Sequence, residues 1–212
     1  MECDFFIRDS YNTAVGYFAL TANTTGTGLA AFGQGALQAS TGSNNTALGN
    51  NTLQANTTGQ YNTAVGKSAL IANTTASYNT AVGYNALTDC TTGANNTAVG
   101  ESAAANVTTG AYNTALGNTS LFANTTSNHN TAVGYAALNV VTGEKNTSVG
   151  SNSLVAATTG HTNTAVGYAA GSAITTGHEN VAIGGNALDA LTTGNDHVAV
   201  GYGALGALTT CL

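Results

Sequence analysis

The chain has 212 residues and a formal net charge of -6, and its only cations are Arg8, Lys67 and Lys145. Charged residues make up 6% of the chain, against roughly 25% in an ordinary domain, and there is no proline or tryptophan. Three scattered cations cannot neutralise a phosphate backbone, so we exclude nucleic acid as a partner.

Residues 1–10, which begin Met1-Glu2-Cys3, do not resemble the rest of the chain. They lack the basic start and long apolar core of a signal peptide. No stretch of the chain reaches the roughly 18 consecutive apolar residues that would span a bilayer. We therefore expect a short N-terminal cap or contact segment followed by one repetitive domain, residues 11–212, without a membrane span.

Residues 11–212 consist of twelve copies of a short motif that closes on a glycine. The full unit reads N-T-A-V-G-Y-x-A-L-x-A-N-T-T-G-x-x, and successive copies are 17 residues apart nine times and 16 apart twice. This period is too short for a pair of helices but accommodates two short strands and their turns. The sequence predicts an all-β fold, a parallel β-solenoid of twelve rungs of 16–17 residues, each rung being one turn of the chain.

Alternation within the first strand, N-T-A-V-G, sends the Thr and Val positions to one face and the Asn and Ala positions to the other. The Val position is always large and apolar, and the Thr position becomes Val181 and Val198 late in the chain. We therefore expect these two columns to point into the solenoid. The A-L segment would form a second strand whose leucines complete the core. The predicted core includes Val15, Leu20, Val65, Leu70, Val82, Leu87, Val133, Leu138, Val166 and Leu205.

The Ala position would then face outward. One Val and one Leu per rung bury little surface against the entropy cost of ordering 17 residues, so a second buried face is expected. A wall of alanines allows another copy to pack closely. We expect a homotrimer whose interface contains Ala14, Ala47, Ala64, Ala81, Ala98, Ala115, Ala132 and Ala165.

The segments NVAIG (180–184), HVAVG (197–201) and the NTAVG-Y-x-A-L units resemble the head repeats of YadA-like trimeric autotransporter adhesins. They resemble even more the NTAVGYxAL repeats of trimeric phage tail fibres and bacterial surface fibres, over roughly residues 11–210. The resemblance implies a left-handed β-roll that trimerises, a structural or adhesive function, and an extracellular, cell-surface or virion-surface location. The unit here is longer than the YadA-type one. The receptor, such as a glycan on a host surface, is left open.

The two ends suggest a second kind of self-association. The chain stops within a rung at Thr209-Thr210-Cys211-Leu212, and exposed strand edges favour pairing with other chains. We hypothesise that copies stack end to end into filaments. Phe5, Phe6 and Ile7 would pack on the last rung of the next copy, with Cys3 near Cys211. The third cysteine, Cys90, completes an odd set that fits neither a disulfide framework nor a zinc motif.

Catalysis requires convergent titratable groups, and nine acids and four histidines are spread along the chain, so we expect no enzyme and no cofactor. His161 and His178 occupy equivalent positions one rung apart and would stack near about 5 Å, close to Glu144 and Glu179, as weak metal candidates. The alternative function is ice binding by an ice-binding (antifreeze) solenoid. The Thr-Thr-Gly corner gives a nearly unbroken Thr column, although adjacent threonines face opposite ways.

Overall fold

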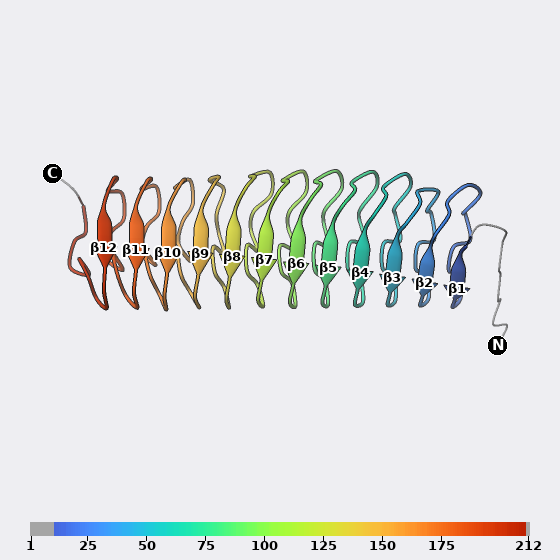
Figure 1. Ribbon diagram of the computed structural model, residues 1–212, viewed down its shortest axis with the longest axis horizontal. Helices are drawn as coiled ribbons and strands as arrows, with labels where there is room; N and C mark the ends of the chain where they lie inside the picture. The colour runs from blue at the N-terminus through green and yellow to red at the C-terminus, as the bar shows by residue number, and fades with distance from the viewer. Residues whose placement is uncertain (1–10, 211–212) are drawn as a thin grey trace. The chain divides into compact units, whose positions relative to one another are not determined.

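The computed structural model describes residues 11–210 and confirms the predicted parallel β-solenoid (Figure 1). The chain divides into two compact units, Met1–Thr109 and Gly110–Leu212, so the predicted repeat domain is distributed over both. Strands of three residues recur once per rung. The first unit contains β1 (Thr13–Val15), β2 (Ala30–Phe32), β3 (Thr46–Leu48), β4 (Thr63–Val65), β5 (Thr80–Val82) and β6 (Thr97–Val99). The second contains β7 (Thr114–Leu116), β8 (Thr131–Val133), β9 (Thr147–Val149), β10 (Thr164–Val166), β11 (Val181–Ile183) and β12 (Val198–Val200).

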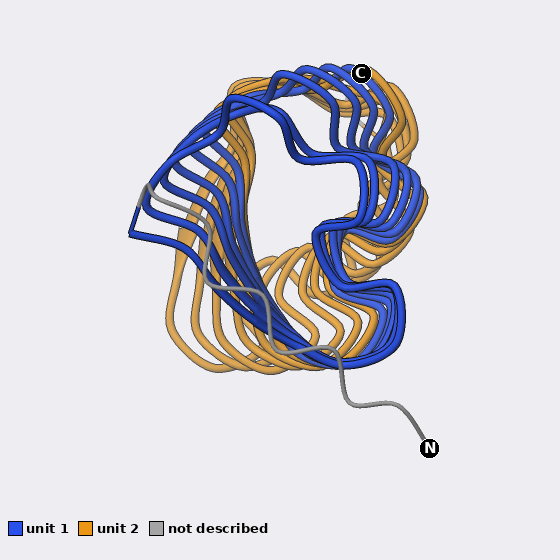
Figure 2. Ribbon diagram, turned by 90° about the vertical axis from the view of Figure 1, so that its right-hand side faces the viewer, with its two compact units in different colours: residues 1–109 blue, residues 110–212 orange. Residues whose placement is uncertain are grey.

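Within each unit, every strand pairs in parallel with the next one along the chain, in the register that the repeat predicts. Ala64 of β4 pairs with Ala81 of β5, for example, and Ala165 of β10 pairs with Ala182 of β11. Viewed along the stack in Figure 2, successive turns of each unit follow nearly the same path. Equivalent residues of successive rungs therefore form columns.

The corner that follows each strand requires glycine. Gly66 has a φ of +122°, and a β-carbon placed on it would lie 2.5 Å from the carbonyl oxygen of Gly83 in the next rung. Gly117 repeats this geometry against Gly134, with a φ of +133°. A side chain at such a corner would strain the backbone and collide with the next rung, except in the last rung, at Gly201, where a β-carbon would have no neighbour within 4 Å.

The predicted second strand, at the A-L segment, is wrong, because this segment is a series of turns. Leu70 has a φ of +51° and Ser68 a φ of +59°, which are left-handed rather than extended conformations. The backbone still bonds to the next rung, since the Leu70 N–H donates to the Ala86 carbonyl at 3.0 Å. A left-handed residue costs roughly 1–2 kcal/mol, and the burial of a leucine side chain offsets a cost of this size.

The direction of the strand side chains is the reverse of the prediction. The Val column is not core: Val15, Val65, Val82 and Val133 are only half-buried, and Val166 is 37% exposed. The alanines predicted as a trimer interface lie inside the protomer, where no second copy can reach them. Their exposed fraction is 6% for Ala14 and 0% for Ala47, Ala64, Ala81, Ala98, Ala115, Ala132 and Ala165.

The reason for the reversal is the narrow interior of a 17-residue rung. The strand shares this interior with the leucines of the turn segment and with two further buried columns, one mainly of asparagine and one of mixed polar and apolar residues, so only a small side chain fits at the Ala position. Ser148 is the exception in the Ala column, and its hydroxyl donates to the buried Ser153 carbonyl at 2.9 Å. A buried Ser with a hydrogen bond confirms that this column faces inward.

A buried asparagine precedes most strands and fastens the rungs together. The Asn79 side-chain oxygen accepts from the N–H of Asn96 in the next rung at 2.8 Å, and its Nδ2 donates to the Gly93 carbonyl at 2.8 Å. The same arrangement recurs at Asn62 and Asn163. Because both ends of the amide are bonded, asparagine can be fully buried without the usual cost of an unpaired polar group.

The leucine column is the part of the predicted core that is confirmed. Leu70, Leu87 and Leu138 are fully buried. The two predicted core leucines at the ends of the described stack differ, since Leu20 is half-buried and Leu205 is 49% exposed. Leu205 is wrong as a core residue because its rung has a described neighbour on one side only. Residues 11–210 contain no helix long and apolar enough to cross a membrane.

Candidate functional site

The outward side of the strands presents two parallel columns, one mostly of threonine and one of large apolar residues. In the apolar column, Leu48 is 49% exposed, Phe32 38% and Ile183 39%. The threonines point the same way, two residues earlier along each strand. A recurrent exposed apolar column is a candidate interaction face, because isolated surface leucines and valines are ordinary but a row of them is not. We call these two columns the outer sheet face.

The first threonine of most corner pairs, which suggested ice binding, is already engaged within the solenoid. The Thr57 hydroxyl donates to the Thr74 carbonyl of the next rung at 2.9 Å, and Thr158 donates to Thr175 at 3.1 Å. The equivalent bond recurs at Thr41, Thr74, Thr91, Thr142, Thr175 and Thr192. These hydroxyls therefore join rungs. The second threonine of a corner pair, such as Thr58 or Thr159, is exposed, and the threonines of the outer sheet face are half-buried or exposed.

Aromatic and histidine rings stack between rungs on the loop that precedes the buried asparagine. His161 and His178 lie one rung apart with ring centroids separated by 4.8 Å, which confirms the predicted stacking. Tyr61 stacks on Tyr78 at 5.1 Å, and Tyr112 on His129 at 5.0 Å. Stacked ring pairs therefore occur on this loop in both units, because the register of the repeat places equivalent residues one rung apart.

The histidine pair is poorly arranged to chelate one metal ion. A ring nitrogen binds a metal along a lone pair in the ring plane, at about 2.0–2.1 Å. The two ring planes are inclined by only 18°, so these directions run side by side and do not converge. Residues 11–210 contain no group of three or more His, Cys, Asp or Glu side chains able to hold a metal ion.

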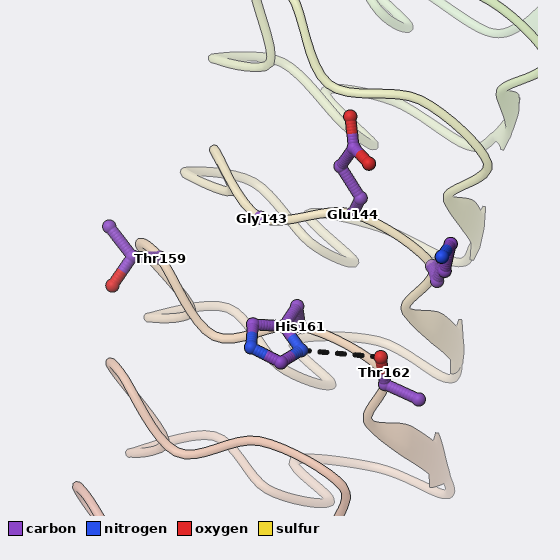
Figure 3. A pocket seen from close by; sticks show the side chains of 6 residues that line it. Gly143, Glu144, Thr159, His161 and Thr162 are labelled. Atoms are coloured by element: carbon purple, nitrogen blue, oxygen red, sulfur yellow. Dashed lines mark hydrogen bonds between the residues drawn. The ribbon is translucent and has the colours of Figure 1, made fainter.

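A shallow pocket of about 320 Å³ lies beside His161, and Figure 3 shows Glu144 and His161, two of the residues that line it, on successive rungs. The other lining residues are Gly143, Lys145, Thr159 and Thr162. Glu144 accepts a hydrogen bond from Asn128 at 3.0 Å, and His161 Nδ1 lies 3.3 Å from the Thr162 hydroxyl. That separation is long for a hydroxyl activated by a base, for which about 2.6–3.2 Å is usual. The pocket provides polar contacts on an exposed loop.

The cysteines and the chain ends contribute little to a described site. Cys90 is free and fully buried, and burial raises the pKa of its thiol from 9.0 to about 12. A thiol with such a pKa carries almost no thiolate at neutral pH, so it is unreactive. The predicted end-to-end contact residues Cys3, Phe5, Phe6, Ile7 and Cys211 lie outside the described residues.

Sequence reasoning missed the outer sheet face because it treated an apolar column as a buried one. The distinguishing pattern was size: the Ala column admits only Ser148 as a substitute, whereas the Val column ranges from Val to Phe32. Close-packed interiors restrict volume more strictly than they restrict apolarity. No protein-family model, curated protein or solved structure matches this chain significantly.

Proposed function

We propose that this protein is a structural fibre protein whose copies associate into homotrimers through the outer sheet face. The observation that supports the proposal most is the apolar column of that face. All twelve rungs place Val, Leu, Ile or Phe there, although the strand's other side already supplies the buried contacts. The trimeric state, the adhesive role and the surface location come from the resemblance to trimeric fibres.

A structural rather than enzymatic role is part of this proposal. The corner-threonine bonds repeat with the period of the rungs, and ring stacks occur in both units, which suits display along a scaffold. End-to-end stacking into filaments remains part of the proposal as well.

The test is the native mass of the full chain by light scattering, with and without reducing agent. A trimer of the 20.9 kDa chain gives about 63 kDa, and filaments give far larger particles. Val65→Lys together with Val82→Lys places two charges on the outer sheet face and should yield monomers. Gln60→Lys, at an exposed loop position, is the matched control and should leave the mass unchanged.

Ice binding is the second candidate, and the structure supplies one observation in its favour. On the outer sheet face, the Thr and Val columns repeat at about 6.6 Å along a strand and about 4.8 Å between strands, which forms a regular array of hydroxyl and methyl groups. A particle of one chain with thermal hysteresis in dilute solution would replace the fibre proposal. A trimer without hysteresis would exclude ice binding.

A further inference from the structure

One column of residues in the second unit alternates between a tyrosine and a small side chain. The position after the corner glycine holds Tyr135, Ser151, Tyr168, Gly185 and Tyr202 on five successive rungs, those of β8 to β12 (Figure 1). Tyr135 is 58% exposed, Tyr168 63% and Tyr202 86%. Exposed rings thus stand on every second rung.

Backbone hydrogen bonds fix the spacing of these rings. The residue after each column position donates its N–H to the carbonyl of the column residue one rung earlier: Asn152 to Tyr135, Ala169 to Ser151, Asn186 to Tyr168 and Gly203 to Gly185, all at 2.9–3.0 Å. Rungs joined in this way are about 4.8 Å apart, so successive tyrosines are about 9.6 Å apart. A gap remains above each small residue, between two rings.

The ring of Tyr202 lies toward the preceding rung. A β-carbon placed on Gly185 would lie 3.4 Å from Cδ2 and 3.6 Å from Cε2 of Tyr202. In the same column of the first unit, the Lys67 ammonium lies 5.9 Å above the Tyr84 ring, one rung away. Each gap, which we call a slot, is therefore bordered by one ring on the preceding rung and one on the following rung. The first slot lies between Tyr135 and Tyr168, and the second between Tyr168 and Tyr202.

An unengaged amide lies beside each slot. Asn152 follows Ser151 and Asn186 follows Gly185, whereas the tyrosine rungs carry Ala136, Ala169 and Gly203 at this position. Both asparagines are half-buried, and among residues 11–210 neither side chain makes a hydrogen bond. Asparagine suits the left-handed backbone here, with φ values of +57° and +55°, and its amide remains free to bind a ligand.

We propose that these two slots bind the pyranose rings of neutral glycans. A saturated six-membered ring presents C–H groups on both faces, and carbon contacts of 3.5–4.0 Å to each tyrosine, plus the thickness of the puckered ring, fill about 9 Å. The amides of Asn152 and Asn186 pair with sugar hydroxyls at the edge of the ring. Aromatic walls with a few polar groups are the usual composition of a small-ligand site.

The slot dimensions and the charge argue against other ring-shaped ligands. A planar aromatic ring between two tyrosines needs only about 7 Å, so a nucleobase or an indole would contact one wall and leave the other. The net charge of -6 also repels nucleic acids and acidic sugars. Two slots about 10 Å apart engage two branches of one glycan, which raises the overall avidity.

The experiment is binding of the labelled full chain to an array of neutral oligosaccharides, followed by calorimetric titration with the best-bound glycan. Tyr168 borders both slots, so Tyr168→Ala should weaken binding at least about tenfold. Tyr84→Ala is the matched control: Tyr84 occupies the same column, but Lys67 and Glu101 fill the adjacent rungs, and binding should be unchanged.

Ser151→Tyr separates a slot from a merely adhesive aromatic surface. The new ring completes a continuous stack like that of Tyr61 and Tyr78, closes the first slot and adds apolar surface. Because it closes a slot, Ser151→Tyr should bind glycan more weakly than the unchanged chain. Stronger binding by Ser151→Tyr would overturn the proposal, and so would equal binding by Tyr168→Ala and Tyr84→Ala. Absence of any bound neutral glycan would also overturn it. Glycan binding goes beyond the proposed fibre role. The two proposals can fail separately, because the native mass tests assembly and the glycan titration tests binding.

Discussion

The two sides of each strand accept side chains of different size, although they are one residue apart in the sequence. The inner side holds Ala in every rung except that of Ser148, whereas the outer side accepts Val, Leu, Ile and Phe. The inner side is fully buried in nearly every rung, and the outer side is half-buried or exposed. Small side chains mark the core of this solenoid, and large apolar side chains mark its surface.

This comparison separates what the rungs need in order to fold from what the surface offers to other molecules. Stability within a unit comes from leucines, alanines and bonded asparagines packed in a narrow interior. The outer sheet face and the tyrosine column are not needed for that packing, so they are available for assembly and binding. Substitutions on the two sides should therefore have separable effects.

The sharpest contrast lies between adjacent residues of β4. Ala64→Leu adds three carbons to a fully buried position with no space around it, and it should lower the free energy of unfolding by about 3 kcal/mol or more. Val65→Leu, one residue later, puts on the outer side the residue already found at Leu48 and Leu116, and should change it by less than about 0.5 kcal/mol. Thermal and denaturant unfolding measure both. Equal losses would mean that the two sides are not distinct.

A second contrast concerns buried and surface asparagines. Asn163→Ala removes the acceptor for the Asn180 N–H and the donor to the Gly177 carbonyl, so it should cost about 2–3 kcal/mol. Asn50→Ala removes one bond, to Gln34, from a half-buried surface position, and should cost less than about 0.5 kcal/mol. The midpoints of denaturant unfolding measure both losses, provided that the dependence of the free energy of unfolding on denaturant is unchanged. A small effect at Asn163 would show that the polar column is incidental to stability.

Much of the fold follows from the sequence because periodicity fixes the register. The 17-residue spacing of the corner glycines predicts which residues lie in one column, and the His161–His178 stack follows from it. The direction in which the strand side chains point did not follow from the sequence, because alternation assigns residues to two faces without saying which face is inside. An asparagine in a buried column reads as a surface residue until its hydrogen bonds are known.

The candidate surfaces were less predictable than the fold. The tyrosines that follow the corner glycine can be read from the sequence, but the slots between them depend on turn geometry. Leu70 and its equivalents adopt left-handed backbone where a second strand was predicted, and sequence propensity disfavours this for leucine. Burial of the side chain overrides the local preference, and this tertiary effect is invisible in a single repeat.

The buried thiol of Cys90 makes the free energy of unfolding depend on pH, which tests the burial of the interior. Burial raises the pKa of Cys90 from 9.0 to about 12, so between these values the unfolded chain releases a proton that the folded chain keeps. The free energy of unfolding should therefore fall as pH rises above 9, by about 1.4 kcal/mol per pH unit from this group. Cys90→Ala should make the decline shallower, because it removes this thiol. Parallel declines in urea unfolding between pH 8 and 11 would contradict a buried thiol.

The smallest expected effect concerns the buried column to which Cys90 belongs. Its composition differs between the two units. This column is largely polar in the first unit, with Asn56 and Asn73 on adjacent rungs, whereas Ile174 and Leu191 fill it in the second. Asn73 donates to Asn56 at 2.8 Å, but its own side-chain oxygen is buried without a partner, because Cys90 occupies the next rung.

Cys90→Asn places an amide donor where that oxygen needs one. If its Nδ2 bonds to Asn73 as Asn73 bonds to Asn56, the free energy of unfolding should rise by about 1 kcal/mol. Cys90→Val, which matches Val107 in the next rung, fills the space without a donor and serves as the control, leaving Asn73 unsatisfied. Stabilisation by valine equal to that by asparagine would mean that volume governs this column in the first unit, as it does in the second.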